Sequence, residues 1–167
     1  MVGQVVLVRH GIAEKRSVVS DDQERQLTTK GADRIKRIAP GLKKLLDPQL
    51  EWQIMASPLA RAAQTGVLLG KKLQLPVRFV AALATGEWPV LARQLSKLSA
   101  RQGVVLVGHE PFLSEWSGLL TGSALPFKKG AAACCRFDEA QVVAKAELRW
   151  FVQPAELIRL GEKGDSS

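Results

Sequence analysis

The two histidines of this chain occupy matching places in the sequence. His10 and His109 each follow a Val-Val-Leu-Val run, at residues 5–8 and 104–107, with one residue between the run and the histidine. A short, continuous apolar run is typical of a strand that is buried on both faces of a sheet. Two such strands lying side by side would bring both imidazoles to one rim of the sheet, where α/β folds place their chemistry. The histidines are therefore the first candidates for a functional site.

Strand-like and helical runs alternate through most of the chain, which indicates a sheet covered by helices on both faces. The predicted strands are residues 4–9, 52–56, 76–80 and 103–108. The predicted helices follow Thr28 and begin at Pro58, Leu91 and Pro111. Near the end, runs 131–138 and 142–151 meet at residues 138–140, which predicts an antiparallel hairpin. The sequence therefore predicts an α/β fold: a three-layer α/β/α sandwich with a mostly parallel mixed sheet and a C-terminal antiparallel hairpin.

The ends of two predicted helices carry capping signals. Thr28 is expected to cap the first helix, and Ser57 is expected to cap the second, which Pro58 opens and which runs to about Leu73. Within the first helix, the pair at residues 40–41, Pro-Gly, should kink or divide the helix. No linker or repeat interrupts the pattern. We therefore expect one domain over residues 1–160 and a polar, flexible tail over 161–167.

Composition bounds the class of protein. The two cysteines, Cys134 and Cys135, are adjacent, so a bond between them would be strained, and they resemble buried thiols of a reducing cytosol. The chain has no Cys-x-x-Cys pair, and we expect neither a metal site nor a cofactor. It has no apolar run of membrane-spanning length and no signal-peptide pattern. We expect a cytoplasmic monomer that does not bind a membrane.

The net charge of +8 points to a negatively charged partner. Nucleic acid is one such partner, and a dedicated binding module would carry a dense basic run or aromatic residues interleaved with the cations. The basic residues here are instead scattered in pairs, such as Lys43-Lys44 and Lys71-Lys72. We therefore expect no nucleic-acid partner. An acidic or phosphorylated partner explains the charge equally well.

Residues suited to binding a phosphate group follow three of the predicted strands. Arg9 supplies a guanidinium that can hold two phosphate oxygens, His10 supplies a lone pair for attack or proton transfer, and Gly11 lets a ligand approach the backbone. Arg61 falls in the first turn of a predicted helix, where the helix dipole and free N–H groups favour an anion. His109 follows the fourth strand. Two arginines and two histidines would thus converge on one pocket.

Taken in order along the chain, these motifs resemble those of the histidine phosphatase superfamily, which includes cofactor-dependent phosphoglycerate mutases and many phosphatases. The motifs are Arg9-His10-Gly11, Leu27-Thr28-x-x-Gly31, Ser57-Pro58-x-x-Arg61-Ala62-x-Gln64-Thr65 and Gly108-His109-Glu110-Pro111. The absence of long insertions and the final segment 148–154 are similar to the SixA-type phosphohistidine phosphatases. The resemblance covers about residues 4–158 and implies a phosphoglycerate mutase-like fold.

The resemblance also implies a role for each matching residue. His10 would be the nucleophile that becomes transiently phosphorylated, and nearby arginines would lower its pKa and keep it neutral. The groups that would bind the equatorial phosphoryl oxygens are Arg9, Arg61 and His109. Further contacts with the phosphate are expected from Arg25, Gly11 and Ser57. Water would then attack the phosphohistidine and release phosphate, without a metal or a cofactor.

A strong general acid is missing from its expected place. Larger members of the superfamily carry an acidic residue after the third strand, but residues 81–87 read Ala-Ala-Leu-Ala-Thr-Gly-Glu. Glu87 comes a few residues late, Asp22 is a second possible general acid, and Glu14 and Glu110 are further alternatives. Each of these could instead be a solvated loop residue. The labile P–N bond of phosphohistidine needs only water or a weak acid at nitrogen, so the sequence favours phosphohistidine over stable phosphomonoesters and disfavours mutase activity.

Three functions stay open at this point. The first is a metal-independent phosphatase that acts on phosphohistidine in a signalling protein, such as a histidine-containing phosphotransfer domain; an open pocket and a basic surface would suit that partner. The second is a phosphatase of small phosphomonoesters. The third is a module that binds phosphate or nucleic acid without turnover, against which the intact set of two arginines and two histidines argues.

Overall fold

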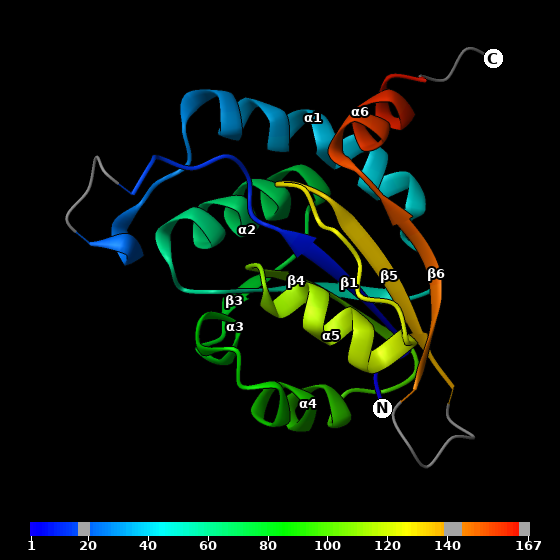
Figure 1. Cartoon of the computed structure of the whole chain (residues 1–167). Coiled ribbons are helices and arrows are strands. Elements are labelled where there is room, and N and C mark those ends of the chain that lie inside the picture. The colour runs from blue at the N-terminus through cyan, green and yellow to red at the C-terminus, as the bar shows by residue number, and fades with distance from the viewer. Residues whose placement is uncertain (17–20, 139–144, 164–167) are drawn as a thin grey trace.

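The computed structural model describes residues 1–16, 21–138 and 145–163, and a six-stranded sheet forms its centre (Figure 1). The strands are β1 (Gln4–Arg9), β2 (Glu51–Ala56), β3 (Val77–Phe79), β4 (Gln102–Gly108), β5 (Ala132–Phe137) and β6 (Ala146–Val152). Their order across the sheet is β3-β2-β4-β1-β5-β6. β3, β2, β4 and β1 run parallel to one another, whereas β5 runs antiparallel to both β1 and β6. The mixed, mostly parallel sheet predicted from the sequence is confirmed.

The two Val-Val-Leu-Val runs lie side by side in β1 and β4. They pair in parallel and in register, from Val5 with Val104 to Arg9 with Gly108. Every side chain of both runs is buried, because helices cover both faces of these central strands. Burial of a valine or leucine side chain contributes about 1.5–3 kcal/mol relative to exposure. The runs therefore form the centre of the sheet, and the histidines that follow the two strands lie at the same rim.

Helices form a layer on each side of the sheet (Figure 1). One layer contains α1 (Thr29–Leu45), α2 (Ala60–Leu73) and α6 (Pro154–Glu162), and the other contains α3 (Ala82–Thr85), α4 (Trp88–Ser96) and α5 (Phe112–Thr121). Successive strand residues point to opposite faces. In β1, Val6 and Val8 accordingly pack in the core under the first layer, and Val5 and Leu7 in the core under the second. This is the predicted three-layer α/β/α arrangement.

The first predicted helix forms with its expected cap but without the expected division. Thr28 Oγ1 accepts a hydrogen bond from Gly31 N at 2.9 Å, as a capping threonine does. α1 then continues through Pro40 as a single helix. The neighbouring Gly41 lies where α6 crosses, and a Cβ there would come 1.9 Å from Leu157 O. The Pro-Gly pair therefore marks a close helix contact.

The boundary of α2 differs from the prediction, which placed the cap at Ser57. The helix begins at Ala60 after the N-cap residue Leu59, and Ser57 lies outside it. Ser57 Oγ accepts a bond from Leu59 N at 3.2 Å and also contacts a histidine, as described below. The hydroxyl group thus keeps a local bond at the turn before the helix and gains a tertiary partner.

The structure also gives the bounds of the C-terminal hairpin and of the short elements. The C-terminal hairpin is confirmed by the antiparallel pairing of β5 and β6, although β6 begins at Ala146 and the connecting residues 139–144 lie outside the described part. Three short elements are not among those expected from the sequence: the 3-10 helix η1 (Asp22–Glu24), α3 and α6. Residues 161 and 162, expected in the tail, belong to α6, and residues 164–167 are not described.

Within the described ranges, no helix combines the length and apolar character needed to cross a bilayer.

Candidate active site

The two histidines meet at the carboxyl ends of β1 and β4. His10 N donates to Gly108 O at 3.1 Å, which continues the pairing of the two strands by one residue. The imidazole rings stand 5.3 Å apart between centroids, at an interplanar angle of 54°. Both side chains are buried, with 6% of His10 and 5% of His109 exposed. The structure therefore brings together the two histidines as their matching sequences predict.

His10 is held in one tautomer by its own backbone neighbour. Its Nδ1 lies 2.7 Å from Gly11 O, and because a carbonyl oxygen only accepts, Nδ1 carries the hydrogen. The lone pair is then on Nε2. Burial lowers the pKa of His10 to about 3; the bond to Gly11 opposes this effect, while Arg61, Arg9 and the protonated form of His109 add to it. At neutral pH, His10 is an uncharged imidazole with a nucleophilic Nε2.

Thr65 joins the His10 loop to α2, a contact that sequence reasoning missed. Gly11 N donates to Thr65 Oγ1 at 3.1 Å, and this hydroxyl donates to Arg61 O at 2.8 Å. Thr65 is fully buried, so the two bonds fix the loop after β1 against the helix that carries Arg61. Gly11 itself fits closely, since a Cβ there would lie 2.9 Å from Ile35 Cγ1. The signal in the sequence was the i, i+4 spacing of Arg61 and Thr65, which marks a helical back-bond.

His109 is oriented by a different kind of partner. Its Nε2 lies 2.7 Å from Ser57 Oγ, which follows β2, and its buried Nδ1 has no hydrogen-bond partner among the described residues. Burial lowers the pKa of His109 to about 4, and Arg61 adds to that effect while Asp22 opposes it. Ser57 is thus a positioning residue for His109 in this structure. The nitrogen of His109 left for a ligand is Nδ1.

Two arginines from different elements supply positive charge. Arg9, at the end of β1, donates from Nη1 to Phe127 O at 2.8 Å. Arg61, in the first turn of α2 and only 5% exposed, donates from Nη1 to Asp22 O at 2.9 Å. Burial is the main cause that lowers the pKa of both arginines. Because burial disfavours an isolated cation, an anionic ligand beside these groups would offset that cost.

Arg25 comes close to Arg61 through a shared carboxylate. Asp22 receives Arg25 Nε at 2.8 Å, Arg16 Nε at 3.2 Å and Arg61 Nη2 at 3.4 Å. Arg25 also donates from Nη1 to Glu14 O at 3.0 Å, which ties it to the loop that follows β1. Arg25 therefore stands at the edge of the cationic group with its guanidinium turned to a protein carboxylate, and its contact with phosphate stays a prediction.

The proposed general acids contact other protein groups in this arrangement, and their role as acids stays a prediction. Burial acts to raise the pKa of Asp22, but Arg61, Arg25 and Arg16 together outweigh it and hold the pKa below its usual value, so the group is ionised. Glu87 is exposed and accepts from Thr85 Oγ1 at 2.8 Å. Glu110 accepts from Ser114 N at 2.9 Å and also contacts Ser114 Oγ. In the described ranges no carboxylate is hydrogen-bonded to either imidazole.

Unpartnered polar atoms gather at this site. Among the described residues, four buried side-chain nitrogen and oxygen atoms have no hydrogen-bond partner, and three of these are Arg9 Nε, Arg61 Nε and His109 Nδ1. Buried polar atoms without partners are uncommon and call for an explanation. A tetrahedral oxyanion carries several acceptor oxygens and suits the two arginine donors, and also His109 in the tautomer that carries its hydrogen on Nδ1. No cluster of three or more His, Cys, Asp and Glu side chains suited to a metal ion occurs in the described part.

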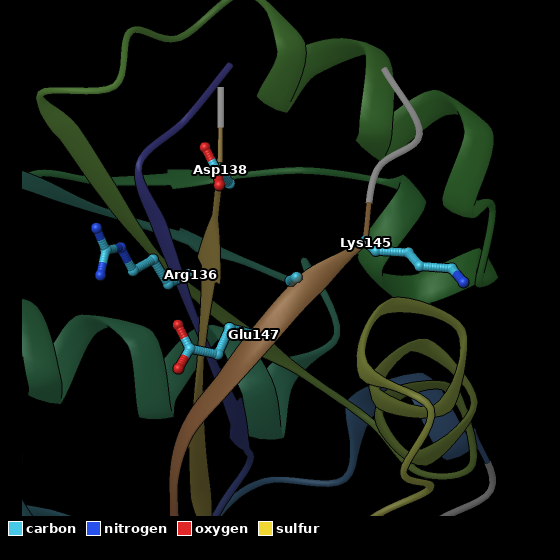
Figure 2. Close-up of a pocket in the computed structure, with 5 residues that line it drawn as sticks. Arg136, Asp138, Lys145 and Glu147 are labelled. Carbon is cyan, nitrogen blue, oxygen red and sulfur yellow. The ribbon is translucent and has the colours of Figure 1, made fainter. Parts of the chain in front are cut away.

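A separate hollow of about 500 Å³ lies at the hairpin, on β5 and β6 (Figure 2). Its lining residues are Arg136, Asp138, Lys145, Ala146 and Glu147. Arg136 pairs with Gln4, at the opposite end of β1 from His10. Figure 2 shows the Lys145 side chain pointing away from Arg136 and Glu147, so these charges do not converge on one ligand. The two histidines and the arginines around them remain the candidate active site.

Comparison with known proteins places this geometry in context. The sequence model of the histidine phosphatase superfamily (branch 1) matches residues 5–92. An uncharacterized protein of Picosynechococcus is 33% identical over 159 residues, which cover 89% of this chain and 94% of the relative. The family model therefore covers the three motifs at residues 9–11, 27–31 and 57–65.

Two solved structures share the fold. The protein histidine phosphatase SixA, complexed with tungstate, superposes with a TM-score of 0.74 at 25% identity and covers 92% of this chain and 99% of its own. A mycobacterial glucosyl-3-phosphoglycerate phosphatase superposes with a TM-score of 0.67 at 17% identity, covering 90% and 99%. At 17% identity, the similarity to the glucosyl-3-phosphoglycerate phosphatase concerns the fold alone. Phosphatases with different named substrates therefore share this architecture.

Proposed function

This chain belongs to the histidine phosphatase superfamily, and from that premise we propose that it removes the phosphoryl group from phosphohistidine in a signalling protein, such as a histidine-containing phosphotransfer domain. The superfamily assignment makes the protein a phosphatase, a hydrolase. The substrate is our inference. The observation that carries it is a buried, neutral His10 with a free Nε2, set among cationic groups that lack a carboxylic acid to protonate a leaving group.

The first chemical step is attack on phosphorus. The Nε2 lone pair of His10 forms a new P–N bond while the P–N bond of the substrate breaks, and the departing imidazole takes a proton from water. Arg9, Arg61 and His109 Nδ1 offer donors for the equatorial phosphoryl oxygens, where charge is neutralised during transfer. Positioning and charge carry most of this chemistry, so the protein needs few reactive groups.

The second step returns the enzyme to its starting state. Water attacks the phosphohistidine at position 10, the P–N bond breaks with its electron pair returning to Nε2, and inorganic phosphate leaves while the water loses one proton to solvent. The Nδ1–H bond to Gly11 O keeps the ring in one orientation through both steps. Because an imidazole leaves with the help of water or a weak acid, the ionised state of Asp22 and the occupied carboxylates of Glu87 and Glu110 fit this substrate.

A phosphatase of small phosphomonoesters is the second candidate. The fold shared with a glucosyl-3-phosphoglycerate phosphatase is the observation that favours it. An alkoxide leaving group is much more basic than imidazole and benefits more from a general acid. The arrangement of the carboxylates described above therefore supports phosphohistidine as the substrate more than a phosphomonoester.

Phosphate release from two substrates tests the proposal. A phosphotransfer domain phosphorylated on histidine and p-nitrophenyl phosphate are each incubated with the protein over a range of concentrations, with the His10→Ala variant as control. We expect kcat/KM at least about tenfold higher for the phosphohistidine domain, a difference of about 1.4 kcal/mol in transition-state binding. Equal or faster turnover of p-nitrophenyl phosphate would favour the second candidate. Binding of the domain without phosphate release would favour a non-catalytic module.

A further inference from the structure

An apolar groove adjoins the arginines on the outer side of α1 and α2. Its volume is about 340 Å³, and its lining residues are Leu27, Ala32, Ala63, Gln64, Val67 and Leu68. Val67 is 38% exposed although its side chain is wholly apolar. Gln64 is the one polar residue in this set, and its Oε1 already accepts from Leu27 N at 2.8 Å. The groove therefore offers a ligand apolar contact and little hydrogen bonding.

The groove begins about one turn beyond Arg61 along α2. Gln64 and Leu68 follow Arg61 by three and seven residues, so they share one side of the helix with it. With a rise of 1.5 Å per residue, Leu68 lies about 10 Å beyond Arg61 along the helix axis. At the near end, Leu27 follows Arg25 by two residues, and Arg25 shares Asp22 with Arg61. A small phosphate ester bound at the arginines would not extend this far, whereas a polypeptide would.

Positive charge borders the far end of the groove. Lys36 follows Ala32 by one turn on α1, and Lys71 follows Val67 by one turn on α2. Both lysines are exposed, and in the described ranges neither takes part in a salt bridge. From the active site outward, the surface thus presents arginines, then apolar side chains, then lysines. A matching partner presents a phosphoryl group, then an apolar side chain, then acidic side chains.

We propose that this groove docks a helix of the protein substrate, one that carries phosphohistidine, an apolar residue one to two turns away and acidic residues beyond it. This rests on the function proposed above. The furrow between two packed helices accepts a third helix by interdigitation of side chains. On that third helix, residues four and seven positions from the phosphohistidine share its face and lie about 6 and 10 Å away, which matches the spacing from Arg61 to the groove.

The test compares a protein substrate with a small one for the Val67→Glu variant. The probes are a helical phosphotransfer domain phosphorylated on histidine and free phosphohistidine. Since Val67 is partly exposed, the substitution is compatible with folding. We expect kcat/KM for the phosphorylated domain to fall about tenfold, through loss of one apolar contact, and kcat/KM for free phosphohistidine to keep its value. Leu119→Glu is the matched control, because Leu119 is 62% exposed on α5 in the other helix layer.

A second variant probes the charged end. Lys71→Glu is expected to lower kcat/KM for the phosphorylated domain a few-fold at low salt, with the difference shrinking as ionic strength rises. The docking proposal is overturned if Val67→Glu and Lys71→Glu both behave as Leu119→Glu does, or if both probes lose activity equally. Hydrolysis of p-nitrophenyl phosphate but of neither phosphohistidine probe by the unmodified protein would overturn the proposed function itself, and the docking proposal with it.

Discussion

β1 and β4 share the run Val-Val-Leu-Val and are each followed by a histidine, but the two imidazoles have different hydrogen-bond partners. Both carry Val-Val-Leu-Val, pair in register and place a histidine at one rim. His10 gives its Nδ1 hydrogen to the adjacent carbonyl of Gly11 and keeps Nε2 free, whereas His109 contacts Ser57 through Nε2 and keeps Nδ1 free. A repeated strand therefore brings two rings to one place, and the neighbours of each ring decide which nitrogen faces a ligand.

The two strand ends also differ in their charged neighbours. Arg9 precedes His10, and its register partner Gly108 precedes His109, so the positive charge belongs to one end alone. The charges that lower the pKa of His10 are His109, Arg61 and Arg9. At His109, the carboxylate of Asp22 opposes the arginines. The structure thus separates a ring suited to nucleophilic attack from one suited to binding oxygen atoms.

Removal of the nucleophile is the most severe test of this difference. We expect His10→Ala to lose phosphate release by about 10⁴-fold or more, because no other group supplies the free imidazole nitrogen at this position. Rapid quenching of the unmodified protein during turnover should trap acid-labile phosphate on His10. The same label on His109 in either protein would reverse the assignment of the two rings. Circular dichroism provides the check that the variant folds.

His109→Ala should have a smaller effect and leave the covalent step in place. We expect kcat to fall about 10²-fold, the usual loss for one donor that stabilises transition-state charge. Acid-labile phosphate should still form on His10, only more slowly, in rapid-quench experiments. Complete loss of label in this variant would show that the two histidines act as one unit. Ser57→Ala offers a milder comparison, since it removes only the partner of Nε2.

Stability should fall on the acid side because both histidines are buried in the neutral form. In the folded chain their pKa values are about 3 and about 4, below the 6.5 of the free side chain. Between those values the unfolded chain binds protons that the folded chain does not, so the free energy of unfolding decreases as the pH falls from 6.5 toward 4. Each histidine contributes up to about 1.4 kcal/mol per pH unit.

Urea denaturation at pH 7, 6 and 5 measures this slope. His10→Asn and His109→Asn should each flatten it, because each removes one proton-binding group. A slope that stays the same in both variants would mean that neither ring resists protonation in the folded state. The control for general acid effects is Leu119→Glu, whose exposed position should leave the histidine contribution intact.

Asp22→Asn is expected to give the smallest change and to distinguish the two rings. Loss of the carboxylate removes a charge that raises the pKa of His109, so that pKa should fall further, with a smaller change at His10. The same substitution frees Arg61 and Arg25 from a competing anion and should strengthen binding of inorganic phosphate a few-fold, the modest effect of an exposed ion pair. Histidine NMR titration and calorimetry measure the two effects. Weaker phosphate binding would show that Asp22 organises the arginines instead of competing for them.

Much of the architecture followed from local patterns. Continuous apolar runs predicted β1 and β4, alternation of strands and helices predicted the layers, and Thr28 predicted the start of α1. These succeed because a strand buried on both faces needs apolar side chains at every position. The same patterns placed Arg9, His10 and His109 at one rim, where the structure has them.

Local patterns failed where a side chain has a tertiary partner. Ser57 matches a helix cap in sequence, but its hydroxyl lies against His109, 52 residues away. Asp22 resembles a solvated loop residue or a general acid, but three arginines hold it ionised. The spacing of Thr65 from Arg61 indicates only a bond within the helix, yet Thr65 also links the His10 loop to α2. The contacts of Ser57 with His109, Asp22 with Arg61 and Thr65 with Gly11 join residues 52, 39 and 54 positions apart, and no periodicity records them.

The sequence by itself determined which residues could do chemistry and that they stand at the ends of buried strands. The strand order decided that the two histidines are neighbours, because β1 and β4 pair across the centre of the sheet while β2 and β5 flank them. Only the structure shows which nitrogen of each ring has a protein partner: Nδ1 of His10 lies beside Gly11 O, and Nε2 of His109 lies beside Ser57 Oγ. Burial is encoded by composition along a strand, but the direction of a hydrogen bond depends on which distant group the fold brings within about 3 Å.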